Sequence, residues 1–483
     1  MSEYQFLTEA IKKEMTYYSI PGCAIVVIDH GKSSSFQFGY SDVENKKEFT
    51  VDTISGIGSC SKSMTAFAAM RLAEKNILDL DAPVVSYVPS FALWNEEASK
   101  HVTIRDMLCH RTGLGGHDGT WPDNDITRVE FLARLKYMEP NEPFRKLAQY
   151  SNVMYIAVGG IMEAVTGKKW ENIMAEEIFQ PLGMNKTFCL MEEAVQQGNC
   201  AVPYWWNNGL HAVSRWNIDM AGPCGSVMSS AQDMAKWLML HIGKGKKENL
   251  KLISEANFLD MHTAQIIMDY PHIKGGNSLG YGLGWRVMDY HGHIVQQHTG
   301  KIEGYSAFQF YLPEEECGAV FLQNIHAPDN PFIFTIQGLL LDHFLKRLPV
   351  DWLNIYTEKM EHAPEAMYHN LEFNCMPPVP MKVTKQSHEL SAYIGTYKNK
   401  GYGIFTISLE KDRLWLHERA VLYRPMQHFS GDTFEVQQVK EDTDLYSLPL
   451  TFMLSYDKSQ VVGFKLLMEP KVQAVEFEKI HGK

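Results

Sequence analysis

Two segments with the pattern of β-hairpins lie at opposite ends of a long helical region. The first is "GCAIVVIDHGKSSSFQFG" at 22–39, in which two strand-like runs flank a turn. The second is "YSAFQFYLPEEECGAVFLQN" at 305–324, and a pair of shorter runs around a His291-Gly292 turn precedes it. Between them, from about 59 to 260, the pattern is mainly helical. We therefore expect an α+β fold in which the first and last segments close one antiparallel sheet around a helical insertion.

The pattern changes after the last predicted helix of this region, at 327–347. A stretch containing "NCMPPVPMKV" at 374–383 is typical of a linker. Beyond it, strand-like runs alternate with turns at 411–412 and 456–458, which is typical of a meander or a barrel. A chain of 483 residues is also too long for one average domain. We predict three parts: a first domain at 1–348, a linker at 349–387 and a small all-β domain at 388–483.

Charge and cysteine usage argue against several classes of function. The chain has 57 acidic and 45 basic residues, a net charge of -12 and no basic run, so nucleic acid and anionic membranes are not expected partners. The N-terminal "MSEYQFLTEAIKKEM" lacks the apolar core of a secretory signal, and no apolar run approaches the ~18 residues that span a bilayer. We therefore expect a cytoplasmic protein. The eight cysteines form no CxxC pair, so we expect buried thiols rather than a zinc ribbon or a dithiol redox site.

A candidate nucleophile opens the segment "GIGSCSKSMTAFAAMRLAEKN" at 56–76. Ser59 and Lys62 are three residues apart, so on a helix they share one face, and a neighbouring base makes a serine hydroxyl nucleophilic. Two other S-x-x-K matches, at 408–411 and 455–458, fall in predicted strands or turns, where this spacing does not bring the side chains together. On this motif alone, an N-capping serine followed by a solvated lysine is the simpler explanation.

Two further motifs contain groups that an acyl-transfer site needs. In Tyr150-Ser151-Asn152, a phenol beside a lysine can act as a base, and an amide can bind a substrate carbonyl and the lysine. In His298-Thr299-Gly300-Lys301, the glycine lets a substrate run along a strand end, and the next backbone N–H can point at an oxyanion. Each motif also has an ordinary structural explanation, namely a tyrosine at a helix start and the end of a hairpin.

Together and in this order, the three motifs resemble the serine β-lactamase and penicillin-binding-protein-like hydrolases, in the branch of class C β-lactamases, D-aminopeptidases and esterases. Members carry S-x-x-K, then Y-x-N about ninety residues later, then a K-T-G or H-x-G strand. Flanking stretches add to the resemblance: "VTIRDMLCHRTGL" at 102–114, "AGPCGSVMSSAQDMAKWL" at 221–238 and "YGLGW" at 281–285. The resemblance covers roughly residues 5–345, and the C-terminal part resembles the lipocalin-like domain of some of these hydrolases.

The resemblance implies a β-lactamase-like sheet with a helical subdomain and a reaction through an acyl-enzyme. Ser59 would attack an acyl carbon, Lys62 and Tyr150 would carry its proton, and Tyr150 would return it to the leaving group. The substrate-binding residues would be Asn152, His298, Thr299, Gly300 and Lys301. The backbone N–H groups of Ser59 and Lys301 would hold the oxyanion. No cofactor and no metal are implied.

The chain departs from the family pattern at His298, where many members carry a lysine. A lysine is a fixed cation for a substrate carboxylate, whereas a histidine is mostly neutral at pH 7. We therefore expect peptidase, amidase or esterase chemistry on a small-molecule or peptide substrate, rather than efficient β-lactam hydrolysis. An acyltransferase and a receptor that stays acylated need the same acyl-enzyme, so the motifs leave both open. They do not predict the oligomeric state.

Overall fold

The structure, a computed structural model, describes residues 4–121, 126–206, 209–215, 217–247, 249–270, 272–326, 331–357, 377, 382–418, 423–437, 447–469 and 472–480. Most of the predicted linker, including nearly all of "NCMPPVPMKV", lies outside the described residues.

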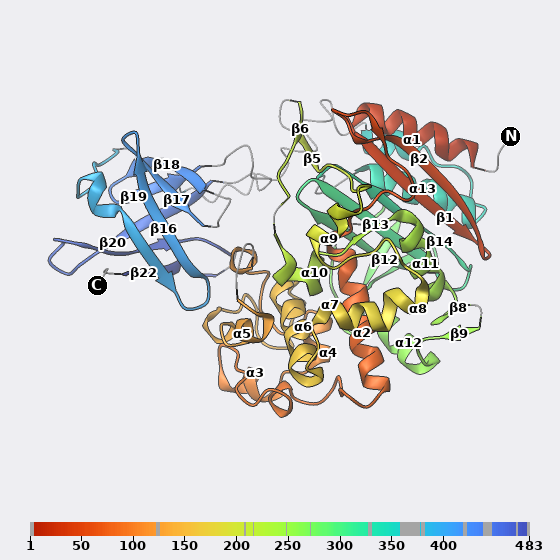
Figure 1. Cartoon of the computed structure of the whole chain (residues 1–483), viewed down its shortest axis with the longest axis horizontal. Helices are drawn as coiled ribbons and strands as arrows, with labels where there is room; N and C mark the ends of the chain where they lie inside the picture. The colour runs from red at the N-terminus through yellow and green to blue at the C-terminus, as the bar shows by residue number, and fades with distance from the viewer. Residues whose placement is uncertain are drawn as a thin grey trace.

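An antiparallel sheet of eight strands forms the centre of the first domain (Figure 1). Its order is β10-β11-β12-β13-β14-β1-β2-β3, so the N-terminal hairpin pairs with the last hairpin through β1 and β14. This confirms the predicted sheet closed by its first and last segments. Its strands are β1 Gly22–Asp29, β2 Lys32–Asp42, β3 Lys47–Glu48, β10 Gly276–Tyr281, β11 Arg286–Tyr290, β12 His293–Ile302, β13 Tyr305–Leu312 and β14 Cys317–Gln323.

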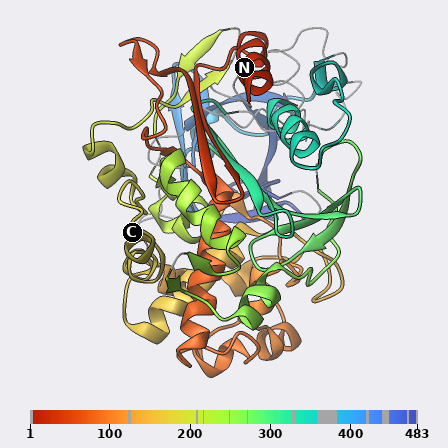
Figure 2. The ribbon, with the colours of Figure 1, turned by 90° about the vertical axis from the view of Figure 1, so that its right-hand side faces the viewer.

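Helices cover both faces of the sheet, which explains why β1 is buried along almost its whole length. Ile25 lies in a core with α1 and α13, and its neighbour Val26 lies in a second core with α2 and α11, because successive strand side chains point to opposite faces. Figure 2 shows the sheet between these two sets of helices. Their bounds are α1 Gln5–Tyr17, α13 Pro331–Phe344, α2 Ser61–Glu74 and α11 Ala231–Ile242.

The insertion between the two hairpins is mainly helical, as predicted. Its central helix, α6 (Asn152–Thr166), is buried from Val153 to Met162 because it is apolar on every side, and its N-terminus lies near that of α2. The other helices are α3 Glu96–His101, α4 Ile104–Leu108, α5 Arg128–Leu132, α7 Trp170–Met174, α8 Gln180–Leu182, α9 Met191–Gln196, α10 Gly222–Gly225 and α12 Glu255–His262. Three two-stranded pairs complete it: β4 Ser55–Gly56 with β7 Met228–Ser229, β5 Tyr204–Trp206 with β6 Leu210–Ala212, and β8 Lys246–Lys247 with β9 Leu250–Lys251.

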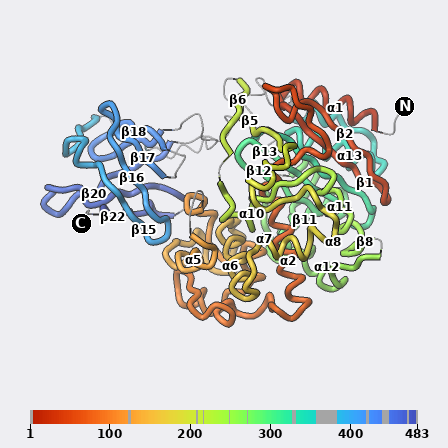
Figure 3. The backbone as a smooth tube through the Cα atoms, in the orientation of Figure 1, coloured from red at the N-terminus to blue at the C-terminus, as the bar shows by residue number. Residues whose placement is uncertain are grey.

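The C-terminal part is a closed barrel of eight strands in sequence order, in which β15 also pairs with β22. This confirms the predicted all-β domain. Its interior is packed with aromatic side chains such as Tyr397, Phe452 and Phe464. Figure 3 shows the barrel beside the helical part of the first domain. Its strands are β15 Gly395–Asn399, β16 Gly403–Glu410, β17 Arg413–His417, β18 Tyr423–Ser430, β19 Thr433–Val436, β20 Leu448–Leu454, β21 Val461–Leu466 and β22 Val475–Ile480.

One further helix falls inside the predicted linker. Helix α14 (Trp352–Thr357) packs back on α13, where the Trp352 indole is buried over Gly338 and donates to Asp342 Oδ2 at 2.7 Å. Residues past 348 therefore still pack on α13. Among the described residues, no helix is long and apolar enough to cross a membrane.

Candidate active site

The turn before α2 and the end of β12 approach each other at two glycines. Gly58 has φ +48°, and a Cβ there would lie 2.4 Å from the backbone nitrogen of Lys301. A Cβ at Gly300 would lie 1.9 Å from the carbonyl oxygen of Ile57. Neither contact is possible for a larger residue, so both positions require glycine. The glycines thus bring Ser59, which follows Gly58, next to the strand segment that the sequence assigns to the oxyanion.

Lys62 connects this turn to the rest of the domain. Its side chain is fully buried, and Nζ donates to Ser59 Oγ at 3.0 Å and to the carbonyl oxygen of Cys224 at 2.8 Å. Cys224 lies in α10, which packs against the start of α2. The two hydrogen bonds fix the amine one helical turn from a partly exposed serine hydroxyl, within reach for proton transfer.

The side chains around Ser59 have structural partners instead. Ser61 and Ser63 are buried, and their hydroxyls donate to the backbone carbonyls of Gly58 and Cys60. The Cys60 thiol is also buried, and burial raises its pKa to about 12, which makes it a packing residue rather than a nucleophile. Of the three serines between Ser59 and Ser63, only Ser59 has an exposed surface.

Tyr150 lies beside the Ser59–Lys62 pair without a hydrogen bond to it. Lys62 Nζ is 4.8 Å from the centre of the Tyr150 ring, which is a cation–π distance. The ring also packs on His110, with ring centres 4.4 Å apart. Within the described ranges the Tyr150 hydroxyl has no hydrogen-bond partner. Proton transfer through Tyr150 requires the phenol to come closer, as catalytic groups commonly do when substrate binds.

Asn152 points to a neighbouring loop rather than to the lysine. Its Nδ2 donates to Asp118 Oδ1 at 2.8 Å, where the sequence suggested a contact with Lys62. Two hydrogen bonds of Ser151 fix the same motif. Its backbone N–H donates to His110 Nδ1 at 3.1 Å, and its Oγ donates to the Gly115 carbonyl at 2.8 Å. His110 is fully buried, which lowers its pKa well below the ordinary value, so it is a neutral acceptor here.

The segment 115–121, called the Asp118 loop below, is held on its other side by the barrel. The His117 N–H donates to Glu469 Oε2 at 2.8 Å, and His117 Nδ1 lies 2.6 Å from Tyr402 Oη. His117 Nε2 donates to the Glu139 carbonyl at 3.0 Å, so Nδ1 accepts the Tyr402 proton. Burial lowers the pKa of His117 to about 4 and raises that of Glu469. The barrel therefore contacts the loop that positions Asn152.

The ring of His298 is buried behind the strand edge. Its Nδ1 lies 2.6 Å from the Thr299 carbonyl oxygen, to which it donates, so Nε2 accepts from the Tyr281 hydroxyl at 2.8 Å. Burial, with Arg286 and Lys62 nearby, lowers the pKa of His298 well below its ordinary value. The ring is neutral, as expected, but both nitrogens are occupied, and this geometry favours a role in positioning Thr299 over direct contact with a substrate carboxylate.

Arg286 places a fixed cation beside the same strand. Its Nη1 donates to Thr299 Oγ1 at 3.2 Å, and its guanidinium lies 5.0 Å from the centre of the Tyr270 ring. Its Nε is buried without a hydrogen-bond partner, and in the described part of the chain no carboxylate forms an ion pair with Arg286. A partly buried arginine next to a threonine hydroxyl is suited to receive an anionic group from a ligand.

The three histidines in "HGHIVQQH" have separate surroundings. His293 pairs with Glu315, His298 with Tyr281, and His291 lies exposed in the turn. Among the described residues, no group of three or more His, Cys, Asp or Glu side chains could hold a metal ion.

The structure thus brings together Ser59, Lys62 and Tyr150 with residues 298–301, and places Asn152 at the rim. The sequence interpretation missed Arg286 and the contact of Asp118 with Asn152. The His291-Gly292 turn sets the register of its hairpin, in which Arg286 pairs with Gln297, two residues before Thr299. The hairpin pattern in the sequence could therefore have indicated that Arg286 lies near Thr299.

Comparison with known proteins identifies the family of this chain. Residues 7–340 match the family described as Beta-lactamase, and residues 379–479 match a domain of unknown function, DUF3471. The "Unguisins hydrolase ungD'" of Aspergillus campestris is 26% identical over 435 residues, covering 87% of this chain and 79% of the relative.

Two solved structures have the same fold. The octameric penicillin-binding protein homologue from Pyrococcus abyssi aligns with a TM-score of 0.60 at 23% identity, covering 99% of this chain and 100% of the other. The D-amino acid amidase from Ochrobactrum anthropi SV3 aligns with a TM-score of 0.60 at 23% identity, covering 71% and 98%. The chain therefore belongs to the beta-lactamase family and is a serine hydrolase related to penicillin-binding proteins.

Proposed function

We propose that this hydrolase forms its acyl-enzyme on Ser59 and cleaves an amide, peptide or ester bond of a small substrate. The observation that carries the proposal is the 3.0 Å contact between Lys62 Nζ and Ser59 Oγ, at the turn where Gly58 and Gly300 bring β12 against the serine. The alternative explanation, an N-capping serine with a solvated lysine, does not account for a lysine that is fully buried.

The reaction follows from the groups around Ser59. Ser59 Oγ bonds to the acyl carbon as its proton passes to Lys62, and the backbone N–H groups of Ser59 and Lys301 receive the oxyanion. Lys62 then passes this proton through Tyr150 to the leaving nitrogen or oxygen, and the bond to the leaving group breaks. Water attacks the Ser59 ester, the acid product leaves, and the proton returns to Oγ. Loss of one oxyanion donor typically costs about 10²–10³ in rate.

Arg286 changes the expected substrate preference. The neutral ring of His298 provides no cation for a substrate carboxylate, but Arg286 supplies a permanent cation that hydrogen-bonds Thr299. A carboxylate near the scissile bond could accept from the guanidinium and the Thr299 hydroxyl, in a charge-assisted contact worth roughly 1.5–3 kcal/mol. We therefore propose amides or short peptides with a free carboxylate on the leaving side. Relatives named as a hydrolase and as a D-amino acid amidase support amide cleavage.

A substrate panel on the full chain tests the proposal. We expect steady turnover of an aminoacyl amide or dipeptide panel, loss of turnover in Ser59→Ala, and native rates in Ser408→Ala. Ser408 is the matched control, because it also fits S-x-x-K and its hydroxyl lies 2.7 Å from His417 Nε2. A single stoichiometric burst without turnover would contradict hydrolysis and indicate a receptor that stays acylated. Product formation only with an added amine or alcohol would indicate an acyltransferase.

A further inference from the structure

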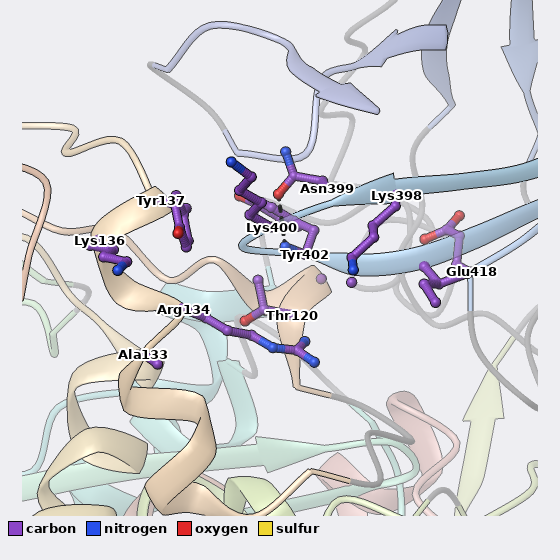
Figure 4. Close-up of a pocket in the computed structure, with 13 residues that line it drawn as sticks. Thr120, Ala133, Arg134, Lys136, Tyr137, Lys398, Asn399, Lys400, Tyr402 and Glu418 are labelled. Carbon is purple, nitrogen blue, oxygen red and sulfur yellow. Dashed lines mark hydrogen bonds between the residues drawn. The ribbon is translucent and has the colours of Figure 1, made fainter. Parts of the chain in front are cut away.

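A cleft of about 680 Å³ lies where the barrel meets the helical part of the first domain. One wall comes from the turn after α5, with Arg134, Lys136 and Tyr137, and from the end of the Asp118 loop. The other comes from the first strands of the barrel, with Lys398 and Lys400. In Figure 4, Arg134 and Lys398 extend toward the middle of the cleft from opposite walls. Its size is that of a small-molecule site.

The charge of this cleft is opposite to that of the protein. Its lining contains four cations, Arg134, Lys136, Lys398 and Lys400, in a chain whose net charge is -12. The one carboxylate among the lining residues is Glu418, which is buried and pairs with Arg424 at 3.3 Å. The four cations therefore create a local positive potential at the junction of the two domains.

These four cations have no acidic partner among the described residues. In the part of the chain that the structure describes, no carboxylate lies within ion-pair distance of any of the four. Arg134 is partly buried against Gly403 of the barrel, and its pKa is lowered mainly by burial. Glu130, an acidic residue whose charge acts on Arg134, caps α5 through Thr127 instead.

An aromatic surface completes the cleft. The Tyr137 ring is 45% exposed, and ammonium groups from both walls lie over it: Lys136 Nζ at 5.1 Å and Lys400 Nζ at 5.5 Å from the ring centre. These contacts hold two lysines on either side of the domain junction in range of one ligand.

We propose that this cleft binds a small molecule carrying several phosphate groups. Three lysines act as compact point charges for phosphate oxygens, and Arg134 can bind two oxygens of one group. The cations come from both domains, so one multivalent anion would contact both walls. Several phosphates would also offset four cations for which the described residues provide no carboxylate partner.

Tripolyphosphate is the probe, titrated into the full chain by calorimetry at low salt. We expect saturable binding that weakens as salt is added, and at least tenfold weaker binding in the double variant Arg134→Gln/Lys398→Gln. The matched control is Lys382→Gln/Lys385→Gln, which removes the same charge from exposed positions outside the cleft and should change the affinity less than twofold. If the double variant does not fold, Lys398→Gln alone is measured instead, because Lys398 is exposed and its replacement leaves the packing unchanged.

Amide hydrogen exchange locates the binding. Tripolyphosphate should slow exchange in 133–137 and in 398–404, the two walls, while hydrolysis of an uncharged ester by the variants stays at the native rate. The proposal would be overturned by no saturable binding, by equal weakening in the control pair, or by protection confined to other segments. Citrate binding as tightly as tripolyphosphate would overturn the assignment to phosphate.

Discussion

Acid should weaken the hold of the barrel on the Asp118 loop, and His117 is the group through which it acts. His117 is 1% exposed, accepts from Tyr402 and donates to the Glu139 carbonyl, an arrangement that requires a neutral ring. Protonation would put a charge in this buried site and turn the acceptor nitrogen into a second donor facing a hydroxyl. His117→Asn removes the titrating group, and asparagine tolerates the left-handed φ of +46° at this position.

The size of the effect follows from the two pKa values. The pKa of His117 is about 4 in the folded protein, against 6.5 as its ordinary value. The unfolded chain therefore binds the proton more readily than the folded protein. The contribution of neutral His117 to folding stability is fully present above pH 6.5, falls as pH drops from 6.5 toward 4, and then levels off. A pKa difference of about 2.5 corresponds to roughly 3 kcal/mol. Glu469 acts in the opposite direction, because burial raises its pKa and its protonation therefore favours the folded state. The net loss of folding stability on acidification is thus at most the roughly 3 kcal/mol that the pKa difference of His117 gives.

The assay is urea unfolding of the native chain and His117→Asn at about pH 7.5 and about pH 4.5, followed by tryptophan fluorescence. At the higher pH the variant should be less stable by about 1–3 kcal/mol, because asparagine lacks the Nε2–H group that donates to the Glu139 carbonyl. At the lower pH the difference in the free energy of unfolding between the native chain and the variant should become smaller or vanish. His30→Asn is the matched control, since His30 has the same φ of +46° in the exposed turn between β1 and β2. A difference in the free energy of unfolding that stays constant with pH, or that narrows equally in the control, would show that His117 is not the titrating group.

Three further outcomes are expected. Lys62→Ala and Tyr150→Phe should have strongly non-additive effects on the rate of acylation in a double-mutant cycle, because each group needs the other; additive losses would contradict a shared proton path. Arg286→Gln should lower kcat/KM about tenfold to a hundredfold for an amide with a free carboxylate relative to its uncharged match, and equal losses on both would remove Arg286 from recognition. Gly300→Ala should abolish acylation, since its Cβ would lie 1.9 Å from the Ile57 carbonyl oxygen. Gly225→Ala should be tolerated, since the nearest atom to its Cβ would be 3.8 Å away, and the acylation rates of the two variants test this.

The sheet could be predicted from the sequence because its hairpins are local. The turns at 29–32 and 291–292 fix which residues pair, as in Asp29 with Lys32 and Tyr290 with His293. The barrel could be predicted from the same alternation. The division into 1–348, 349–387 and 388–483 stays a prediction, and α14 shows that no local pattern marked where packing on the first domain ends.

The site was only partly predictable, because its side-chain directions depend on tertiary contacts. The i, i+3 spacing sufficed for Ser59 and Lys62, which one helix carries. The strand pattern of β12 does not predict that the His298 ring is buried against Tyr281. The contact of His117 with Glu469 joins residues that are 352 positions apart, and no local motif encodes such a pair.

Ser59 is proposed to carry the acyl group, and trapping the intermediate shows directly which residue is acylated. The full chain is mixed with an amide or ester that it turns over, quenched in acid during the steady state, digested and mapped by mass spectrometry. We expect a mass increase equal to the acyl group on the peptide containing Ser59, and no adduct in Ser59→Ala. An acyl group on another residue, or undiminished turnover in Ser59→Ala, would contradict this assignment.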